Sequence, residues 1–275
     1  VAQFIADDCD MAAEYLYDTD KWSSTDTGRA TRLSAKGLKS RVLLYIASPL
    51  YNGDELFAEL KDPDDGTPLI SQTYDKKKWK AAADAALDCI STAEQSGREL
   101  YNEKPEDPVL NYQNIFNDNW NDEILWAKNI GTYDHWLNCS DPVSFGCFSI
   151  LDPTQEMVDA YEMEDGSTPI TGYTNDGLVP VINKESGYVE SGFAEDEFEG
   201  RWQKGVSNMY THREPRFYAS INFAGAIWKT TRESNWTKPH VNEFWFRGID
   251  GKNNAGSDYC KTGYLMKKLH YPTRI

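Results

Sequence analysis

Residues 28–52 read GRATRLSAKGLKSRVLLYIASPLYN and hold the clearest helix pattern of the chain. Apolar side chains recur there at spacings of four and three residues and so share one helical face; they are Leu38, Val42 and Tyr45. Pro49 disfavours helical backbone at the residue before it, so we expect the helix to run from about Thr31 to Ser48. This segment predicts that the first part of the chain is helical.

Further helices are expected on both sides of this segment. Residues 2–17 place on one helical face Ile5, Cys9, Ala12 and Leu16. Another helix follows Asp75, which we expect to cap it, and its predicted inward face carries Trp79, Ala83, Ala86, Ile90 and Ala93. The alanines allow a neighbouring helix to approach closely, as in the first helix of a tetratricopeptide unit. There is no clean repeat of about 34 residues, so any antiparallel helical bundle explains the periodicity equally well.

Shorter elements are expected in the second half of the chain. Asp152 is predicted to cap a short helix that has Pro153 in its first turn. Apolar and polar residues alternate over 217–223, which predicts a strand that turns at Gly225. Residues 263–269 are the expected partner strand of this hairpin.

These patterns predict a mainly α fold with two domains. Residues 1–116 are expected to form a helical, tetratricopeptide-like scaffold. Residues 117–275 are expected to form a loop-rich ligand-binding region with short helices and a small β-hairpin. The many aromatic residues of the second region indicate ordered loops, because disordered segments are poor in aromatic side chains.

The chain is strongly acidic, with 28 lysine and arginine residues, 44 aspartate and glutamate residues and a formal charge of −16. This balance argues against nucleic acid as a partner and against charge-driven binding to anionic lipid, since both need a cationic face. No stretch approaches the roughly 20 apolar residues of a membrane span. The sequence starts at Val1 with a helical pattern and no signal peptide, so we expect a mature or trimmed fragment.

The cysteines contain no CxxC pair, which argues against a zinc ribbon or a thioredoxin-like site. Cys9 and Cys89 fall on apolar helix faces and are expected to be buried thiols. Cys139 and Cys147 lie in a loop region and can form a disulfide in an oxidising compartment. The sequence does not identify that compartment.

The common catalytic motifs GxGxxG, GxxxxGK[ST], HExxH and GxSxG are absent. Metal-ligand spacing is also absent from the histidines, which are His135, His212, His240 and His270. We therefore predict no catalytic residue, no metal and no cofactor. Glycoside hydrolysis would need two carboxylates at a fixed separation. The candidates, which as charge runs are normally solvated, are Asp122, Glu123, Glu195, Asp196 and Glu197.

Aromatic residues in polar loops are the most informative candidates for a site. The face of an indole packs on the C–H face of a pyranose, and neighbouring polar groups hydrogen-bond the sugar hydroxyls. On this basis the predicted ligand-binding residues are Tyr133, His135, Trp136, Trp236, Trp245 and Arg247. The alternative is that each ring fixes its loop to the protein body, the role assigned to Trp22, Trp79, Trp126 and Trp228.

Several segments, in a consistent order, resemble the SusD/RagB-like nutrient-binding lipoproteins of Bacteroidetes. Residues 28–52 look like the most recognisable helix of that family. The other matching segments are 65–69, 73–86, 121–129, 153–163, 213–220 and 263–268. These are scaffold motifs spread over most of the chain, so they do not identify the residues that contact a ligand.

The resemblance implies tetratricopeptide-like helix pairs that hold a variable, loop-rich ligand site. It implies a non-enzymatic lipoprotein on the outer surface of the outer membrane, which captures oligo- or polysaccharide. It also implies a SusC-like TonB-dependent transporter as partner and a lipid anchor outside this chain. Members of the family are longer, so further scaffold helices are expected beyond Ile275, and Cys9 is not the lipid-bearing cysteine because it lies within a predicted helix.

Two other functions are compatible with the sequence. A glycoside hydrolase would use a carboxylate pair, and a structural subunit of a transporter complex would bind peptide or no sugar. The loop tryptophans distinguish these alternatives, because a glycan-binding protein exposes them and a purely structural role buries them.

Overall fold

The computed structural model describes residues 1–18, 24–127, 134–198, 200–230 and 239–270. As the sequence predicted, the chain is mainly helical with a few short strands. Its residues form two compact units: a helical unit of Val1–Leu100 with Trp120–Ile130, and a mixed unit of Tyr101–Asn119 with Gly131–Ile275. The predicted division into domains at residue 116 stays a prediction.

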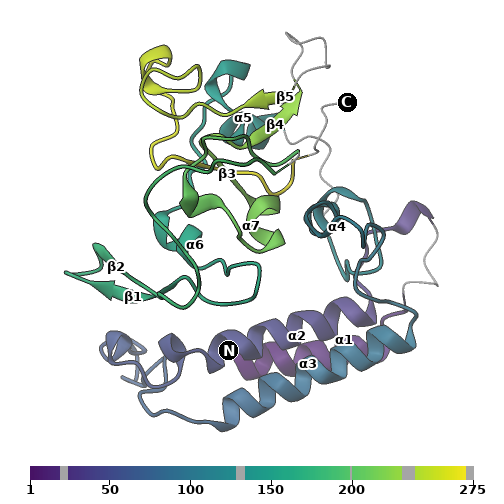
Figure 1. Ribbon diagram of the computed structural model, residues 1–275. Helices are drawn as coiled ribbons and strands as arrows, with labels where there is room; N and C mark the ends of the chain where they lie inside the picture. Colours follow the sequence, from purple (N-terminus) through teal and green to yellow (C-terminus); the bar gives the residue numbers. More distant parts are fainter. Residues whose placement is uncertain (19–23, 128–133, 199, 231–238, 271–275) are drawn as a thin grey trace. The chain divides into compact units, whose positions relative to one another are not determined.

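The described part of the helical unit contains the α-helices α1 (Ala2–Tyr15), α2 (Arg32–Ala47) and α3 (Lys77–Gln95). α2 packs against both α1 and α3, and Figure 1 shows the helices running side by side. Between them lie the 3₁₀ turns η2 (Ser24–Asp26), η3 (Pro49–Tyr51) and η4 (Glu55–Phe57). The helices predicted over residues 2–17 and 31–48 are confirmed.

Local hydrogen bonds define both ends of α2. Ser34 N donates to Thr31 Oγ1 at 3.1 Å and Thr31 N donates to Ser34 Oγ at 2.7 Å, which forms a capping box. At the other end the buried Asn52 donates through Nδ2 to the carbonyl oxygens of Ala47 at 3.3 Å and Asp75 at 3.1 Å. Asn52 Oδ1 accepts from Asp75 N at 2.8 Å. This one amide therefore connects the end of α2 to the residues that precede α3.

The buried face of α3 differs from the predicted one. Ala82, Ala85 and Cys89 are buried. Trp79 and Ile90, which were expected to face inward, keep 40 % and 54 % of their surface exposed. Both sets of residues have helical spacing, so periodicity alone does not decide which one meets the neighbouring helix. The small side chains face inward because they allow α2 and α3 to approach closely.

The core of the helical unit is small and consists mostly of alanine. One buried cluster contains Ala6, Leu43, Ala47, Ala82 and Ala85, and Leu33 is also completely buried. The large apolar side chains of the same helices lie on the outside and include Phe4, Met11, Tyr15, Leu38, Leu44, Tyr45 and Leu87. Small side chains therefore predominate where these helices pack together.

The mixed unit combines short helices with paired strands. Its described helices are α4 (Pro108–Asn117), α5 (Asp134–Ser140), α6 (Gln155–Asp159) and α7 (Pro215–Ser220), with the 3₁₀ turns η5 (Val143–Phe145), η6 (Asn208–Tyr210) and η7 (Lys252–Asn254). Antiparallel pairs join β1 (Ile170–Thr174) to β2 (Val179–Ile182), β3 (Ile221–Phe223) to β6 (Tyr264–Met266), and β4 (Ile227–Thr230) to β5 (Pro239–Val241). The pairing of β3 with β6 confirms the predicted partner strand.

Residues 217–220, which were predicted to be strand, form the helix α7 instead. Pro215 occupies the first turn of this helix, where its fixed backbone angle is favourable and its missing N–H is not needed. All four residues are buried, so the alternation in the sequence does not mark one buried face of a strand. The strand begins at Ile221, and the turn after it contains Gly225 with φ of +88°.

The predicted helix caps are displaced by one or two residues. Lys76 occupies the N-cap position of α3, and Asp75 Oδ1 accepts a hydrogen bond from Lys77 N at 2.9 Å. Thr154, and not Asp152, caps α6. In both cases an acidic residue lies close to the helix start, and the backbone places a different residue at the cap itself.

The core of the mixed unit is aromatic and surrounds a buried arginine. Phe217 stacks on Phe223 with ring centroids 5.3 Å apart, and Tyr210 lies 4.5 Å from Phe223. The guanidinium of Arg213 is buried and lies 4.9 Å from the centroid of Phe217. This cluster occupies the region between α6, α7 and β3.

Arg213 supplies hydrogen bonds to carbonyl groups at the end of α6. Its Nη2 donates to the carbonyl oxygens of Val158 and Tyr161, each at 2.7 Å, and its Nη1 donates to Met209 O at 3.1 Å. Val158 O also accepts from Tyr161 N at 3.4 Å, so the arginine adds a charged donor to this helix-end carbonyl and bonds Tyr161 O beyond it. Burial lowers the pKa of Arg213, and the hydrogen bonds offset part of the loss of hydration.

The five cysteines are buried thiols, and no disulfide joins Cys139 to Cys147. Within the described ranges, no helix has both the length and the apolar character needed to cross a bilayer. The same part of the chain contains no cluster of three or more His, Cys, Asp or Glu side chains that could hold a metal ion.

Candidate functional site

An exposed loop of aromatic and basic residues follows β5 in the mixed unit. We call residues 243–251 the aromatic loop. Trp245, Phe246 and Ile249 keep 52 %, 61 % and 49 % of their surface exposed, and Arg247 is also exposed. Contiguous exposed apolar side chains of this kind mark binding surfaces more often than scattered single ones do.

Backbone hydrogen bonds coil the aromatic loop tightly. Gly248 N donates to Trp245 O at 2.8 Å, and Gly251 N donates to Gly248 O at 2.9 Å. A Cβ atom at Gly248 would lie 2.1 Å from Glu243 O, and one at Gly251 would lie 1.9 Å from Trp245 O. Only glycine fits at these two positions, so the coil has a single defined shape.

The buried carboxylate of Asp250 anchors the base of the loop. It accepts hydrogen bonds from His240 Nε2 at 2.8 Å, Ser144 Oγ at 2.5 Å and Glu243 N at 2.9 Å. Burial alone would raise the pKa of Asp250, but the hydrogen bond and charge of His240 outweigh it, and the pKa lies below its ordinary value. The ring of Phe145 packs edge-on against His240, with centroids 4.9 Å apart. These contacts fasten the loop to β5 and η5.

Two of the predicted site residues lie on this loop. Trp245 and Arg247 are two residues apart and both exposed. Within the described part of the chain, Arg247 makes no ion pair with a carboxylate, so its guanidinium is available to a ligand. An exposed indole beside an exposed guanidinium can stack on a ring and donate hydrogen bonds to it.

Two other predicted residues lie on α5 of the same unit. Trp136 keeps 41 % of its surface exposed, and His135 is also exposed. The Nε2 atom of His135 lies 3.8 Å from Cys139 Sγ, and its ring centroid lies 6.3 Å from that of Phe148. The remaining predicted residues, Tyr133 and Trp236, lie outside the described residues.

The structure also tests the tryptophans that were assigned to packing. Trp228 is buried and its ring packs against His270, with centroids 5.1 Å apart, which confirms the assignment. Trp126 keeps 57 % of its surface exposed and Trp79 keeps 40 %, so neither is mainly a core residue. Trp22 lies outside the described residues.

A buried serine, histidine and aspartate have the approximate geometry of a catalytic triad. His270 Nε2 lies 2.8 Å from Ser140 Oγ, and His270 Nδ1 lies 3.5 Å from Asp141 Oδ1. All three side chains are at most 1 % exposed. Ser140 Oγ is also within 2.9 Å of the carbonyl oxygen of Trp136, which is the usual acceptor for a serine inside a helix. Solvent and substrate cannot reach this serine, so we interpret the cluster as part of the packing.

Four of the five candidate carboxylates for glycoside hydrolysis are exposed, and Glu123 is half-buried. Glu195, Asp196 and Glu197 are exposed. Asp122 is exposed as well and lies 3.5 Å from Arg98 Nη1. None of these side chains is part of the aromatic loop, where an exposed indole is available to hold a sugar.

Known proteins resemble this chain in sequence and in fold. The model of the SusD family matches residues 110–273, which is more than half of the chain. Among solved structures, BT4246 is 25 % identical with a TM-score of 0.70, over 98 % of this chain and 49 % of that protein. A SusD-like protein (BF3747) from Bacteroides fragilis NCTC 9343 is 21 % identical with a TM-score of 0.63, over 99 % of this chain and 43 % of that protein.

A SusD-like carbohydrate binding protein (BF0978) from the same organism is 15 % identical with a TM-score of 0.56, over 98 % of this chain and 39 % of that protein. This chain therefore spans about half of the length of these solved structures, or less. Curated proteins give no match. The family resemblance predicted from the motifs is confirmed by the family model, and the chain belongs to the SusD family.

Proposed function

We propose that this chain is the glycan-binding part of a nutrient-capture protein that does no chemistry on its ligand. The observation that carries the proposal is the tightly coiled aromatic loop, which exposes Trp245 beside Arg247. Membership of the SusD family supports it, and one solved structure with this fold is described as a carbohydrate binding protein.

The chemistry of the aromatic loop suits a neutral sugar. The exposed indole of Trp245 offers a flat apolar face to the C–H bonds of a pyranose, and the guanidinium of Arg247 offers several N–H donors to its hydroxyls. Because the loop is already fixed by Asp250 and two glycines, little conformational entropy is lost when a ligand binds. His135, Trp136, Tyr133 and Trp236 stay predicted contacts of the same ligand.

Capture without cleavage is the activity that these residues support. The Ser140–His270–Asp141 cluster is sealed from solvent, and Asp122, Glu195, Asp196 and Glu197 are exposed side chains. A glycosidase would instead hold two carboxylates on either side of the bound sugar. We therefore propose glycan binding and delivery, with no catalytic residue.

The cellular setting of the proposal comes from the family. We place the protein at the outer surface of the outer membrane, held by a lipid anchor outside this chain. A SusC-like TonB-dependent transporter would receive the captured oligo- or polysaccharide. This chain would then concentrate the glycan for uptake.

A second candidate function is favoured by the apolar part of the aromatic loop. Phe246 and Ile249 are as exposed as Trp245, and neither can hydrogen-bond a sugar. Trp and Arg beside exposed apolar side chains are also the residue types that dominate protein–protein hot spots. The loop would then dock on a protein, such as the transporter, as expected for a structural subunit.

Calorimetric titration with a panel of neutral and acidic polysaccharides tests both candidates. For glycan capture, we expect binding without release of shorter products. Trp245→Ala is expected to weaken binding by about 1–3 kcal/mol, which is the typical contribution of a stacked aromatic face. Trp79→Ala is the matched control, because it removes an exposed tryptophan from the helical unit and should leave affinity unchanged.

Each outcome separates the alternatives. If no polysaccharide binds the folded protein, glycan capture is wrong and the docking function gains support. Shortened products after incubation would instead establish a hydrolase. Unchanged affinity in Trp245→Ala would remove the aromatic loop from the glycan site while leaving glycan capture itself intact.

A further inference from the structure

Two lysine side chains lie against the ring of Tyr259, next to the aromatic loop. Lys252 Nζ and Lys261 Nζ are each 5.2 Å from the centroid of that ring. Both lysines are exposed, and Tyr259 is half-buried. We call Lys252, Tyr259 and Lys261 the basic patch. An ammonium group within about 6 Å of an aromatic centroid is attracted to the electron-rich ring, so one phenol ring holds two positive charges close together.

Hydrogen bonds attach the first lysine of the basic patch to the aromatic loop. Lys252 begins η7, directly after the loop ends. Within η7, Asn253 N donates to Phe246 O at 2.9 Å, and Asn254 Nδ2 donates to Gly248 O at 2.7 Å. The backbone that carries this ammonium group therefore has a fixed position beside the exposed rings of the loop.

The second lysine is anchored from the other side. Lys261 N donates to Asp152 Oδ2 at 2.9 Å. Cys260, which lies between Tyr259 and Lys261, is buried, and its Sγ donates to Tyr264 O at 3.1 Å. The segment that carries the ring and the second ammonium group is therefore fastened to the core of the mixed unit.

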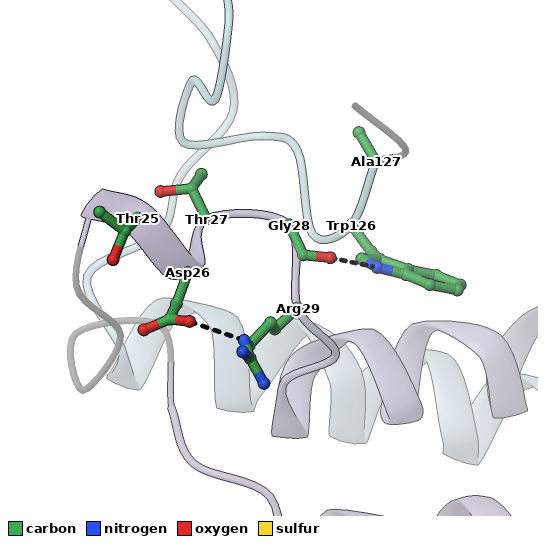
Figure 2. A pocket seen from close by; sticks show the side chains of 7 residues that line it. All are labelled: Thr25, Asp26, Thr27, Gly28, Arg29, Trp126 and Ala127. Atoms are coloured by element: carbon green, nitrogen blue, oxygen red, sulfur yellow. Dashed lines mark hydrogen bonds and ion pairs between the residues drawn. The ribbon is translucent and has the colours of Figure 1, made fainter. Parts of the chain in front are cut away.

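Neither ammonium group of the basic patch is neutralised by a carboxylate. Among the residues that the structure describes, no aspartate or glutamate forms an ion pair with either lysine. Other basic side chains do have such a partner: Figure 2 shows Arg29, whose Nε lies 2.7 Å from Asp26 Oδ1. Two like charges at one ring repel each other, and an anion between them would replace this repulsion by attraction.

The surface around the basic patch has a charge balance opposite to that of the whole chain. The formal charge of the chain is −16. Over residues 247–268, however, the exposed basic side chains are Arg247, Lys252 and Lys261, and the exposed acidic one is Asp258. Asp250 lies in the same range but is buried. The local charge therefore favours an anionic group.

A single anionic group on a sugar fits this patch better than an extended anionic surface does. Charges in solution act over roughly 8–10 Å at physiological ionic strength, so one carboxylate or sulfate at the patch is governed by the nearby cations. A membrane or a nucleic acid presents many charges over a wide area and would also meet the acidic remainder of the chain.

We propose that the basic patch is a subsite for one anionic group of the captured glycan, either the carboxylate of a uronic acid or a sulfate ester. The neutral sugar next to this group would lie on the aromatic loop. The inference rests on the proposed function for the class of ligand, and it adds a preference for charged glycans to it.

Polysaccharides that differ only in charge test this preference by calorimetric titration of the whole chain. Glucuronoxylan and polygalacturonate are each compared with their carboxyl-reduced forms, and a sulfated galactan is compared with its desulfated form. We expect the charged member of at least one pair to bind about tenfold more tightly, which is the typical effect of one hydrogen bond to a charged group.

Substitution of both lysines assigns the preference to the basic patch. The double variant Lys252→Gln with Lys261→Gln removes both charges and keeps side chains of similar length. It should bind the charged and the neutral member of the pair equally, with the affinity for the neutral member unchanged. Lys184→Gln is the matched control, because it removes an exposed lysine of the same unit outside the patch and should keep the preference.

The outcomes distinguish this subsite from the proposed function. If charged and neutral members bind equally to the wild type, or if the preference survives in the double variant, the subsite is wrong and glycan capture stands. If no polysaccharide of any pair binds, both proposals are overturned. Binding to phosphatidylglycerol vesicles that requires the two lysines, without a preference among glycans, would assign the patch to a membrane surface and overturn the subsite.

Discussion

His240 Nε2 lies 2.8 Å from Asp250 Oδ2, and this contact joins β5 to the base of the aromatic loop. Both side chains are almost completely shielded from solvent, at 8 % and 0 % exposed. A hydrogen bond to a carboxylate is stronger without competing water than at the surface, and breaking it leaves the buried carboxylate short of a donor. The shape of the loop that exposes Trp245 therefore depends on this pair.

Asp250→Asn is expected to lower the free energy of unfolding by about 2–4 kcal/mol at about pH 7, because its buried donors lose a charged acceptor. The pKa of Asp250 is lowered in the folded chain. Its contribution is therefore present above the ordinary aspartate pKa and is lost as pH falls through the folded value. Urea unfolding at about pH 7 and about pH 3 gives the free energy of unfolding of wild type and variant. The difference between the two free energies should be smaller at about pH 3. A constant difference would contradict the role assigned to the charge.

Gly248→Ala is expected to disrupt the aromatic loop, because the new Cβ would lie 2.1 Å from Glu243 O. Overpacking of this kind typically costs about 1–3 kcal/mol. Glycan affinity should fall together with stability, although Gly248 carries no side chain that could touch a ligand. The control is Gly256→Ala, where a new Cβ would meet no atom within 4 Å and neither quantity should change. Calorimetric titration and thermal unfolding measure both effects.

Arg213→Lys is expected to destabilise the mixed unit by about 3 kcal/mol, because a single ammonium group cannot reach the carbonyl groups that the guanidinium bridges. Val158 O and Tyr161 O would lose the guanidinium donor at the end of α6. Arg216→Lys is the control: this side chain is 52 % exposed, and surface changes of this kind stay within about 0.5 kcal/mol. Denaturant unfolding compares the two variants, and equal effects would contradict the structural role of Arg213.

Lys267 is expected to make stability depend on pH in the alkaline direction. Its side chain is buried, and burial together with the charge of Arg201 lowers its pKa to about 7, while Asp107 acts in the opposite sense. The unfolded chain keeps an ordinary lysine pKa, so it binds more protons than the folded chain above about pH 7. Stability should therefore rise as pH increases from about 7 to about 10.

Lys267→Met removes this titrating group. The melting temperature should rise most at low pH, so that it depends less on pH than in the wild type. The neighbouring Lys268 is the control, and its Nζ lies 3.9 Å from the ring centroid of Phe116. In Lys268→Met the melting temperature should depend on pH as it does in the wild type. Thermal unfolding between about pH 6 and about pH 10 gives the comparison. An unchanged slope in Lys267→Met would show that this lysine is not the group responsible.

The sequence predicts the elements whose signals are local. Thr31 and Pro49 bound α2 through a capping hydroxyl and a restricted backbone, and both act within a few residues. β3 and β6 were also predictable as separate strands, because a turn glycine lies beside each of them. Family motifs extend this to the fold as a whole.

Long-range packing is what the sequence leaves open. Whether α3 turns Ala82 or Trp79 inward depends on how closely α2 approaches, and both residues fit the same helical period. The exposure of Trp126 depends on the carbonyl of Gly28, which is distant in sequence. The anchor of the aromatic loop combines Ser144 with Asp250, and no short motif contains both.

The buried alanines of the helical unit are expected to tolerate substitution poorly. Leu87 and Ile90 keep more than half of their surface exposed, so a change in their size should cost little stability, unlike a change at the buried Leu33. Small buried positions are intolerant as well: an added methylene at Ala82 or Ala85 would force neighbouring helix axes apart. Substitution scanning of this unit should consequently find its least tolerant sites among alanines as well as leucines.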